Sequence, residues 1–126
     1  MFVYRVEHKD TKEGPYSHCT NGRITCSKLY WRHNSYLVGN EKPGFEDERF
    51  HNLKNSDKYN CGCVTLEKLF TWFDNFVDYL HEMQDFYIVE YKISSKYVRF
   101  GRTGKQCAFI RDKATVVSAK LIKEYV

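Results

Sequence analysis

The chain has 126 residues, of which 42% are hydrophobic and 17% aromatic, and it carries a formal net charge of +4. A chain of this length can bury a core without disulfides or metals, so we expect one globular domain, residues 1–126. The mild positive charge lacks the density typical of dedicated nucleic-acid-binding proteins, which makes nucleic acid a less favoured partner than protein. No apolar run reaches membrane-spanning length, and we expect a cytoplasmic protein without a membrane partner.

The first predicted element is a β-strand over residues 2–8, because the side chains there alternate between two faces. One face carries Phe2, Tyr4 and Val6, and the other carries Val3, Arg5 and Glu7. Arg5 and Glu7 share a face, and we expect them to be exposed structural residues rather than catalysts. Their expected partners across the neighbouring strands are Glu90, Lys92 and Arg99.

Residues 17–60 follow no clear period and are rich in Gly, Asn, Asp and charged residues, which predicts a long irregular region. Long loops within compact domains usually carry function or move. Cations and aromatic residues are interleaved within residues 28–36, and Trp, Tyr and Arg are common anchors at protein interfaces. We therefore predict a partner-binding surface with six candidate anchors: Tyr30, Trp31, Arg32, Tyr36, Phe45 and Phe50.

Two helices are predicted next. The first begins after Thr65, a residue able to cap it, and its apolar face consists of Leu66, Leu69, Phe70 and Phe73. The second begins after Asp74, and its apolar face consists of Phe76, Val77, Leu80 and Met83. We expect both helical faces to pack against Val89 and Tyr91 of the following strand.

The last third of the chain is rich in β-forming residues. Residues 86–93 predict a strand, and residues 97–110 predict a hairpin around the turn Gly101–Gly104. The tail, 112–126, fits a strand or a closing helix equally well. Strands and helices do not alternate, so we predict an α+β fold, with a mainly antiparallel sheet of the N-terminal strand and three C-terminal strands covered by two helices.

Several cysteines and histidines in or near the irregular region could suggest zinc: His18, Cys19, Cys26, His33, His51, Cys61 and Cys63. Structural zinc sites usually draw on cysteine pairs separated by two to four residues. The pairs Cys19–Cys26 and Cys61–Cys63 do not have this spacing. We predict reduced cysteines, no metal and no cofactor.

Two further groups of charged residues are candidate sites. Arg99, Arg102, Lys105 and Arg111 surround the last hairpin and could contact an acidic partner. The coarse order of elements is also similar to that of ADP-ribosyltransferase-like folds. That similarity would place Arg5 or His8 at the nicotinamide ribose and Glu90 or Gln106 at the late polar position, although Gln106 cannot take the charge of a catalytic glutamate.

Four segments carry a second resemblance: YRVEH with the GPY that follows, TLEKLFTWF, FYIVEYKI and GKQCAFIRDKA. Together they resemble a group of small proteins encoded by tailed bacteriophages, over the N-terminal strand and residues 63–114. The resemblance implies a small accessory phage protein, with the blocking of a host antiviral defence as one role, and carries over no site residues. We interpret the chain as a stoichiometric binder of a host protein in the host cytoplasm. The alternative is an ADP-ribosyltransferase-like or nucleotide-binding enzyme acting on a host target.

Overall fold

The computed structural model describes residues 1–12, 14, 59–73, 84–102, 104 and 106–125. The second predicted helix, 74–83, lies outside the described residues, as does the predicted irregular region up to residue 58. In the described ranges, no helix is both long and apolar enough to cross a membrane. The fold is rich in antiparallel β-sheet and contains one described α-helix.

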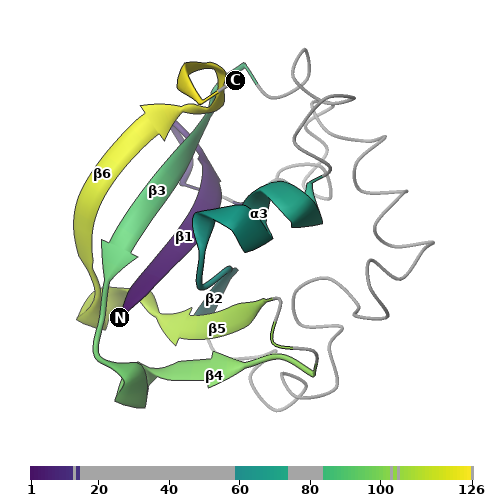
Figure 1. The fold of residues 1–126 in the computed structure, drawn as a ribbon. Coiled ribbons are helices and arrows are strands. Elements are labelled where there is room, and N and C mark those ends of the chain that lie inside the picture. Colours follow the sequence, from purple (N-terminus) through teal and green to yellow (C-terminus); the bar gives the residue numbers. More distant parts are fainter. Residues whose placement is uncertain (13, 15–58, 74–83, 103, 105, 126) are drawn as a thin grey trace.

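The first sheet has three antiparallel strands in the order β1 (Phe2–His8), β3 (Phe86–Lys92) and β6 (Thr115–Leu121) (Figure 1). The predictions of strands over residues 2–8 and 86–93 are thereby confirmed. The ambiguous tail forms strand β6, which a short 3-10 helix, η7 (Ile122–Glu124), follows. The central strand β3 thus joins a strand from near the start of the chain to a strand from its tail.

The second sheet also has three antiparallel strands, in the order β2 (Tyr59–Gly62), β5 (Cys107–Ile110) and β4 (Val98–Phe100). The predicted hairpin over residues 97–110 is confirmed, with Gly104 at a φ of 76° in its turn. The prediction of one four-stranded sheet is wrong. A 3-10 helix, η5 (Ser95–Tyr97), redirects the chain after β3, and the hairpin then pairs with the unpredicted strand β2.

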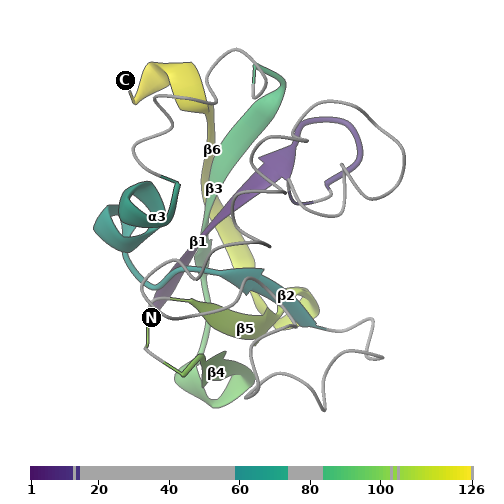
Figure 2. The same cartoon turned by 90° about the vertical axis from the view of Figure 1, so that its right-hand side faces the viewer.

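The helix α3 (Leu66–Trp72) begins where it was predicted, because the hydroxyl oxygen of Thr65 accepts a 3.0 Å hydrogen bond from the Lys68 backbone N–H. It lies beside the first sheet, and the strands of the second sheet lie below it in the view of Figure 2. Its buried face, with Leu69, Trp72 and Phe73 at the end of the helix, belongs to one hydrophobic cluster. The sheet and η7 contribute Val6, Phe86, Ile88 and Ile122 to that cluster.

The expected packing of α3 against Val89 and Tyr91 is therefore wrong. Successive side chains of β3 point to opposite faces, and the helix takes the face of Phe86 and Ile88. Val89 and Tyr91 belong to a second cluster on the other face, together with Phe109 of the second sheet. Both faces of the first sheet are thus covered, one by the helix and one by the second sheet.

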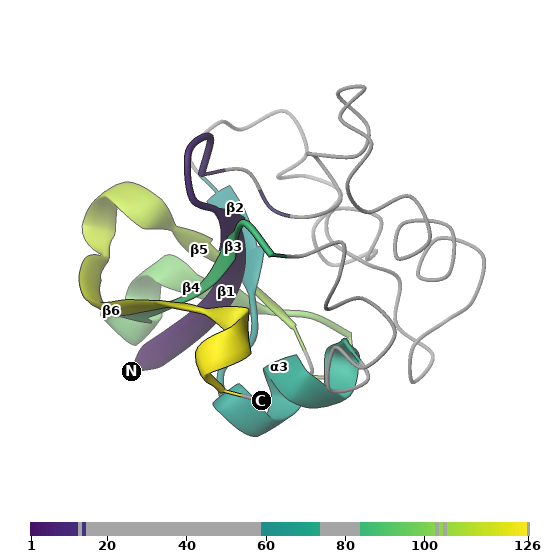
Figure 3. The same ribbon diagram turned by 90° about the horizontal axis from the view of Figure 1, so that it is seen from above.

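Two contacts bring the remaining elements together. η7 lies beside α3 (Figure 3), and the ring of Tyr125 is 6.0 Å from the ring of Phe70. β2 approaches β1 closely at Gly62, where an added Cβ would be 2.7 Å from the carbonyl oxygen of Tyr4 and 2.8 Å from Cγ1 of Val3. A residue without a side chain is therefore required at this crossing.

Candidate functional site

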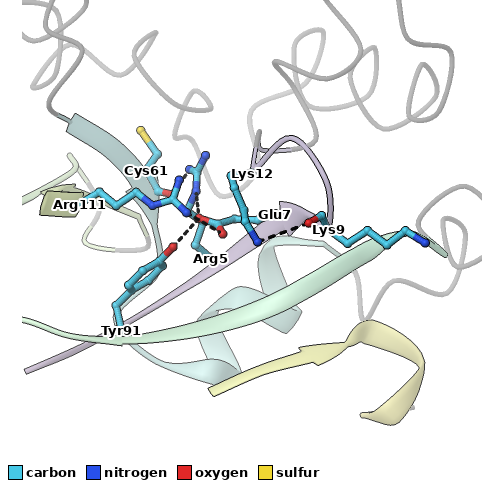
Figure 4. Close-up of polar contacts among 7 residues, drawn as sticks. All are labelled: Arg5, Glu7, Lys9, Lys12, Cys61, Tyr91 and Arg111. Carbon is cyan, nitrogen blue, oxygen red and sulfur yellow. Dashed lines mark hydrogen bonds and ion pairs between the residues drawn. The ribbon is translucent and has the colours of Figure 1, made fainter. Parts of the chain in front are cut away.

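A buried polar cluster surrounds the carboxylate of Glu7, a β1 residue that is only 2% exposed (Figure 4). Its Oε1 accepts a 2.6 Å hydrogen bond from the Tyr91 hydroxyl and a 3.1 Å hydrogen bond from Nε of Arg5. Its Oε2 accepts a 3.3 Å hydrogen bond from Nη2 of Arg111. A buried carboxylate requires such partners, because its removal from water is otherwise very costly.

The same cluster links distant parts of the chain. Nη1 of Arg5 donates a 2.7 Å hydrogen bond to the carbonyl oxygen of Cys61 in β2. Gly14 is buried next to this guanidinium, and a Cβ added to Gly14 would lie 3.3 Å from Nη2 of Arg5. Arg111 reaches Glu7 from the 3-10 helix η6 (Arg111–Lys113), and its guanidinium carbon lies 5.8 Å from the centre of the Tyr91 ring.

The polar contacts of the cluster hold the two sheets together, and we call this set of contacts the clamp. Burial raises the pKa of Tyr91, and its hydrogen bond to Glu7 raises it further, so the phenol stays protonated and donates to the carboxylate. Both oxygens of Glu7 are engaged by partners from other elements. This arrangement suits the joining of strands better than the transfer of protons to a substrate.

The Arg5–Glu7 prediction is partly correct. The two residues share a face and act together, but they pair with each other and with Tyr91 and Arg111, not with the expected Glu90, Lys92 and Arg99. Nor is the pair exposed, since the second sheet packs over this face of β1. The Arg5 guanidinium also bonds to a backbone carbonyl, that of Cys61.

A second feature of the molecule is the outer edge of β6. This seven-residue strand pairs with β3 on one side, and no other described strand pairs with it. Its side chains Val116 and Val117 are 56% and 51% exposed. The pairing places Glu90 opposite Ser118 and Tyr91 opposite Val116, so Val117 is an extra residue in a β-bulge.

A family model described as bacteriophage T4 Y00F protein matches residues 1–123 of the chain. The chain belongs to this family. The predicted resemblance to small phage proteins is thereby confirmed, and the match extends it across the middle of the chain. Neither curated proteins nor solved structures provide a further match.

This member of the Y00F family does not bring all four residues of the alternative nucleotide site together. Arg5 points to the second sheet, whereas His8 and Glu90 lie on the face of α3, opposite Phe86 and Tyr4 respectively. That register separates His8 from Glu90 by roughly 13 Å along the strands. Glu90 instead accepts a hydrogen bond from Tyr4, whose pKa is raised by burial and by this carboxylate.

Gln106 is buried just before β5, where its backbone carbonyl accepts a 2.9 Å hydrogen bond from Gly101 N–H.

The cations of the predicted basic hairpin also occupy separate places. Arg99 is exposed, and its guanidinium carbon lies 5.9 Å from the centre of the Tyr59 ring. Arg102 is exposed in the turn of the hairpin, whereas Arg111 belongs to the Glu7 cluster. Lys105 lies outside the described residues.

The remaining predicted site residues cannot be placed, because they lie outside the described residues. They are the six predicted anchors, Tyr30, Trp31, Arg32, Tyr36, Phe45 and Phe50, and the possible metal ligands His18, Cys19, Cys26, His33 and His51. Cys61, Cys63 and Cys107 carry no disulfide bond, and burial raises the pKa of Cys107 to about 12. In the part of the chain that the structure describes, no three potential ligands gather at one point.

Sequence reasoning missed two features of the structure. Tyr91 and Arg111 were not predicted as partners of Glu7, because they are far from it in the sequence. The β-branched run Thr115–Val117 did favour a strand, yet nothing in that run shows that the strand lies at an edge.

Proposed function

We propose that this chain is a phage accessory protein that binds a host protein stoichiometrically in the host cytoplasm, and thereby inhibits or redirects it. The observation that carries this proposal is the outer edge of β6, with its two exposed valines. Membership of a phage protein family supplies the setting. A host antiviral defence protein is one target that fits this setting.

An edge such as that of β6 supports a binding role for a physical reason. The outer side of an edge strand offers backbone N–H and C=O groups, a ready template for pairing with another chain. Exposed β-branched side chains on that strand add apolar area that a partner can bury. Val116 and Val117 provide both features within one short segment.

The Glu7 cluster also favours binding over catalysis. Its charged groups satisfy one another between the two sheets, which is a structural role. The side chains of Arg5 and Glu90 point to opposite faces of the first sheet. This placement gives less support to the ADP-ribosyltransferase-like alternative than to a binding protein.

The test compares the wild-type chain with a double variant, Val116→Ser and Val117→Ser. Phe100→Ser is the matched control, because Phe100 is a similarly exposed apolar residue in the other sheet. Each immobilised protein is incubated with host lysate, captured proteins are identified by mass spectrometry, and the purified partner is titrated calorimetrically. We expect wild type and control to retain one host protein at a 1:1 ratio and the double variant to lose it. Equal capture by all three proteins, or capture by none, would contradict the proposal.

A further inference from the structure

The charges around β6 narrow the kind of partner that its edge can accept. Four exposed lysines surround the strand: Lys92 opposite Thr115, Lys113 before it, Lys120 within it and Lys123 after it. None of the four forms an ion pair with any carboxylate in the described residues. Lys113 instead lies with its ammonium 5.7 Å from the centre of the Tyr97 ring.

Few acidic groups balance these lysines. Residues 111–125 contain three of these lysines and two carboxylates, Asp112 and Glu124, while the fourth cation of this segment, Arg111, is paired with Glu7. Glu124 is engaged, because its Oε2 accepts a 2.7 Å hydrogen bond from the backbone N–H of Leu121. The edge therefore has an excess of positive charge that an acidic partner would neutralise.

The same lysines disfavour a second copy of this chain as the occupant. Lysines on an edge strand are a common device against edge-to-edge pairing of identical molecules. Two β6 strands side by side would bring two basic edges together without added carboxylates. The β-bulge at Val117 further limits the regular part of the edge to a short stretch, Ser118–Leu121, next to the exposed valines.

We infer that the partner contributes a short, extended, acidic segment that joins the first sheet as a fourth strand beside β6. Backbone hydrogen bonds along the edge supply the attachment, and apolar side chains of the segment cover Val116 and Val117. Acidic side chains of the segment face Lys113, Lys120 and Lys123 and set its specificity. This inference rests on the proposed function, since it names the part of the partner that is bound.

The test uses four seven-residue peptides as probes. The glutamate peptide alternates valine with glutamate. The glutamine peptide and the lysine peptide carry glutamine or lysine at the glutamate positions. The methylated peptide has the sequence of the glutamate peptide, with every second backbone amide methylated. Binding is measured by fluorescence anisotropy at low and high salt, and the site by amide hydrogen exchange. We expect the glutamate peptide to bind about tenfold more tightly than the glutamine peptide, with an advantage that salt reduces. We also expect it to slow exchange in β6.

Two variants locate the charge effect. Lys120→Glu together with Lys123→Glu is expected to reverse the preference from the glutamate to the lysine peptide. Lys12→Glu, a change at an exposed residue four positions beyond the end of β1, is expected to leave the preference unchanged. Equal binding of the glutamate, lysine and methylated peptides, or protection outside β6, would overturn the inference. So would self-association of the chain through β6, detected by light scattering.

The outcomes separate this inference from the proposed function. Valine-dependent capture of a host protein, combined with no binding of the glutamate peptide, would leave the proposed function standing and refute the acidic strand. Binding of the glutamate peptide along β6 without capture of any host protein would refute the proposed function alone.

Discussion

Replacing Glu7 by glutamine should destabilise the fold strongly, although the two side chains have nearly the same shape. The substitution removes the negative charge between Arg5, whose side chain is 12% exposed, and Arg111, whose side chain is 31% exposed. It also replaces the charged acceptor of the Tyr91 hydroxyl by a neutral one. Arg5 would keep its hydrogen bond to the carbonyl oxygen of Cys61.

The size of the effect follows from these contacts. A hydrogen bond to a charged group contributes about 1.5–3 kcal/mol, whereas a neutral one contributes about 1 kcal/mol. Breaking a buried ion pair by removing one partner costs about 3–5 kcal/mol, which is an upper bound because the amide can still accept a hydrogen bond. Arg111 can turn toward water and adds little. We therefore expect Glu7→Gln to lower the free energy of unfolding by about 2–4 kcal/mol.

Urea denaturation followed by circular dichroism measures this loss. Asp112→Asn is the control, because it removes the same charge from an exposed residue and should change stability by no more than about 0.5 kcal/mol. Tyr91→Phe should cost about 1.5–3 kcal/mol in the wild type and less in Glu7→Gln, where the acceptor is neutral. A loss below about 1 kcal/mol for Glu7→Gln, or fully additive effects with Tyr91→Phe, would refute the clamp.

Two further predictions concern close packing and pH. Gly62→Ala should lower the free energy of unfolding by about 1–3 kcal/mol, because the added Cβ would overlap the carbonyl oxygen of Tyr4. Asn60→Ala in the same strand serves as the control. Equal stability of the two variants in urea would contradict the close approach of β1 and β2. Burial raises the pKa of Cys107 from 9.0 to about 12, so its contribution to stability is complete below pH 9 and is lost as the pH rises toward 12. The free energy of unfolding should fall by on the order of 2 kcal/mol between pH 9 and about pH 11. Cys107→Ala should make this decline shallower. An unchanged slope of stability against pH in that variant would contradict the role of Cys107.

Local patterns predicted the elements whose signals are contained in a few neighbouring residues. The alternation over residues 2–8, the β-rich run 86–93 and the glycine-bounded hairpin each correspond to observed strands. Thr65 marks the start of α3 because its capping hydrogen bond joins residues only three apart. Such signals do not depend on the rest of the fold.

Features that depend on pairing between distant segments could not be predicted in this way. Nothing in the sequence of the hairpin shows that it pairs with β2 instead of β3. Its pairing depends on which faces of the sheets are buried together in the folded protein. The burial of Glu7 is equally hidden, because its partners Tyr91 and Arg111 are 84 and 104 positions away. A charged residue on an alternating strand normally indicates a solvent-facing side, and here a second sheet covers it.

The register of the first sheet also sets the order of events during synthesis on the ribosome. β1 pairs with β3 across 78 residues at His8–Phe86 and 90 residues at Phe2–Lys92. At a translation rate of about 5–20 residues per second, β1 waits roughly 4–18 s before its partner strand has been made. During this interval Val3 and Val6 lack the strand that later buries them. Throughout this interval the nascent chain carries an unpaired β-forming segment, and the first sheet cannot form until β3 has been made.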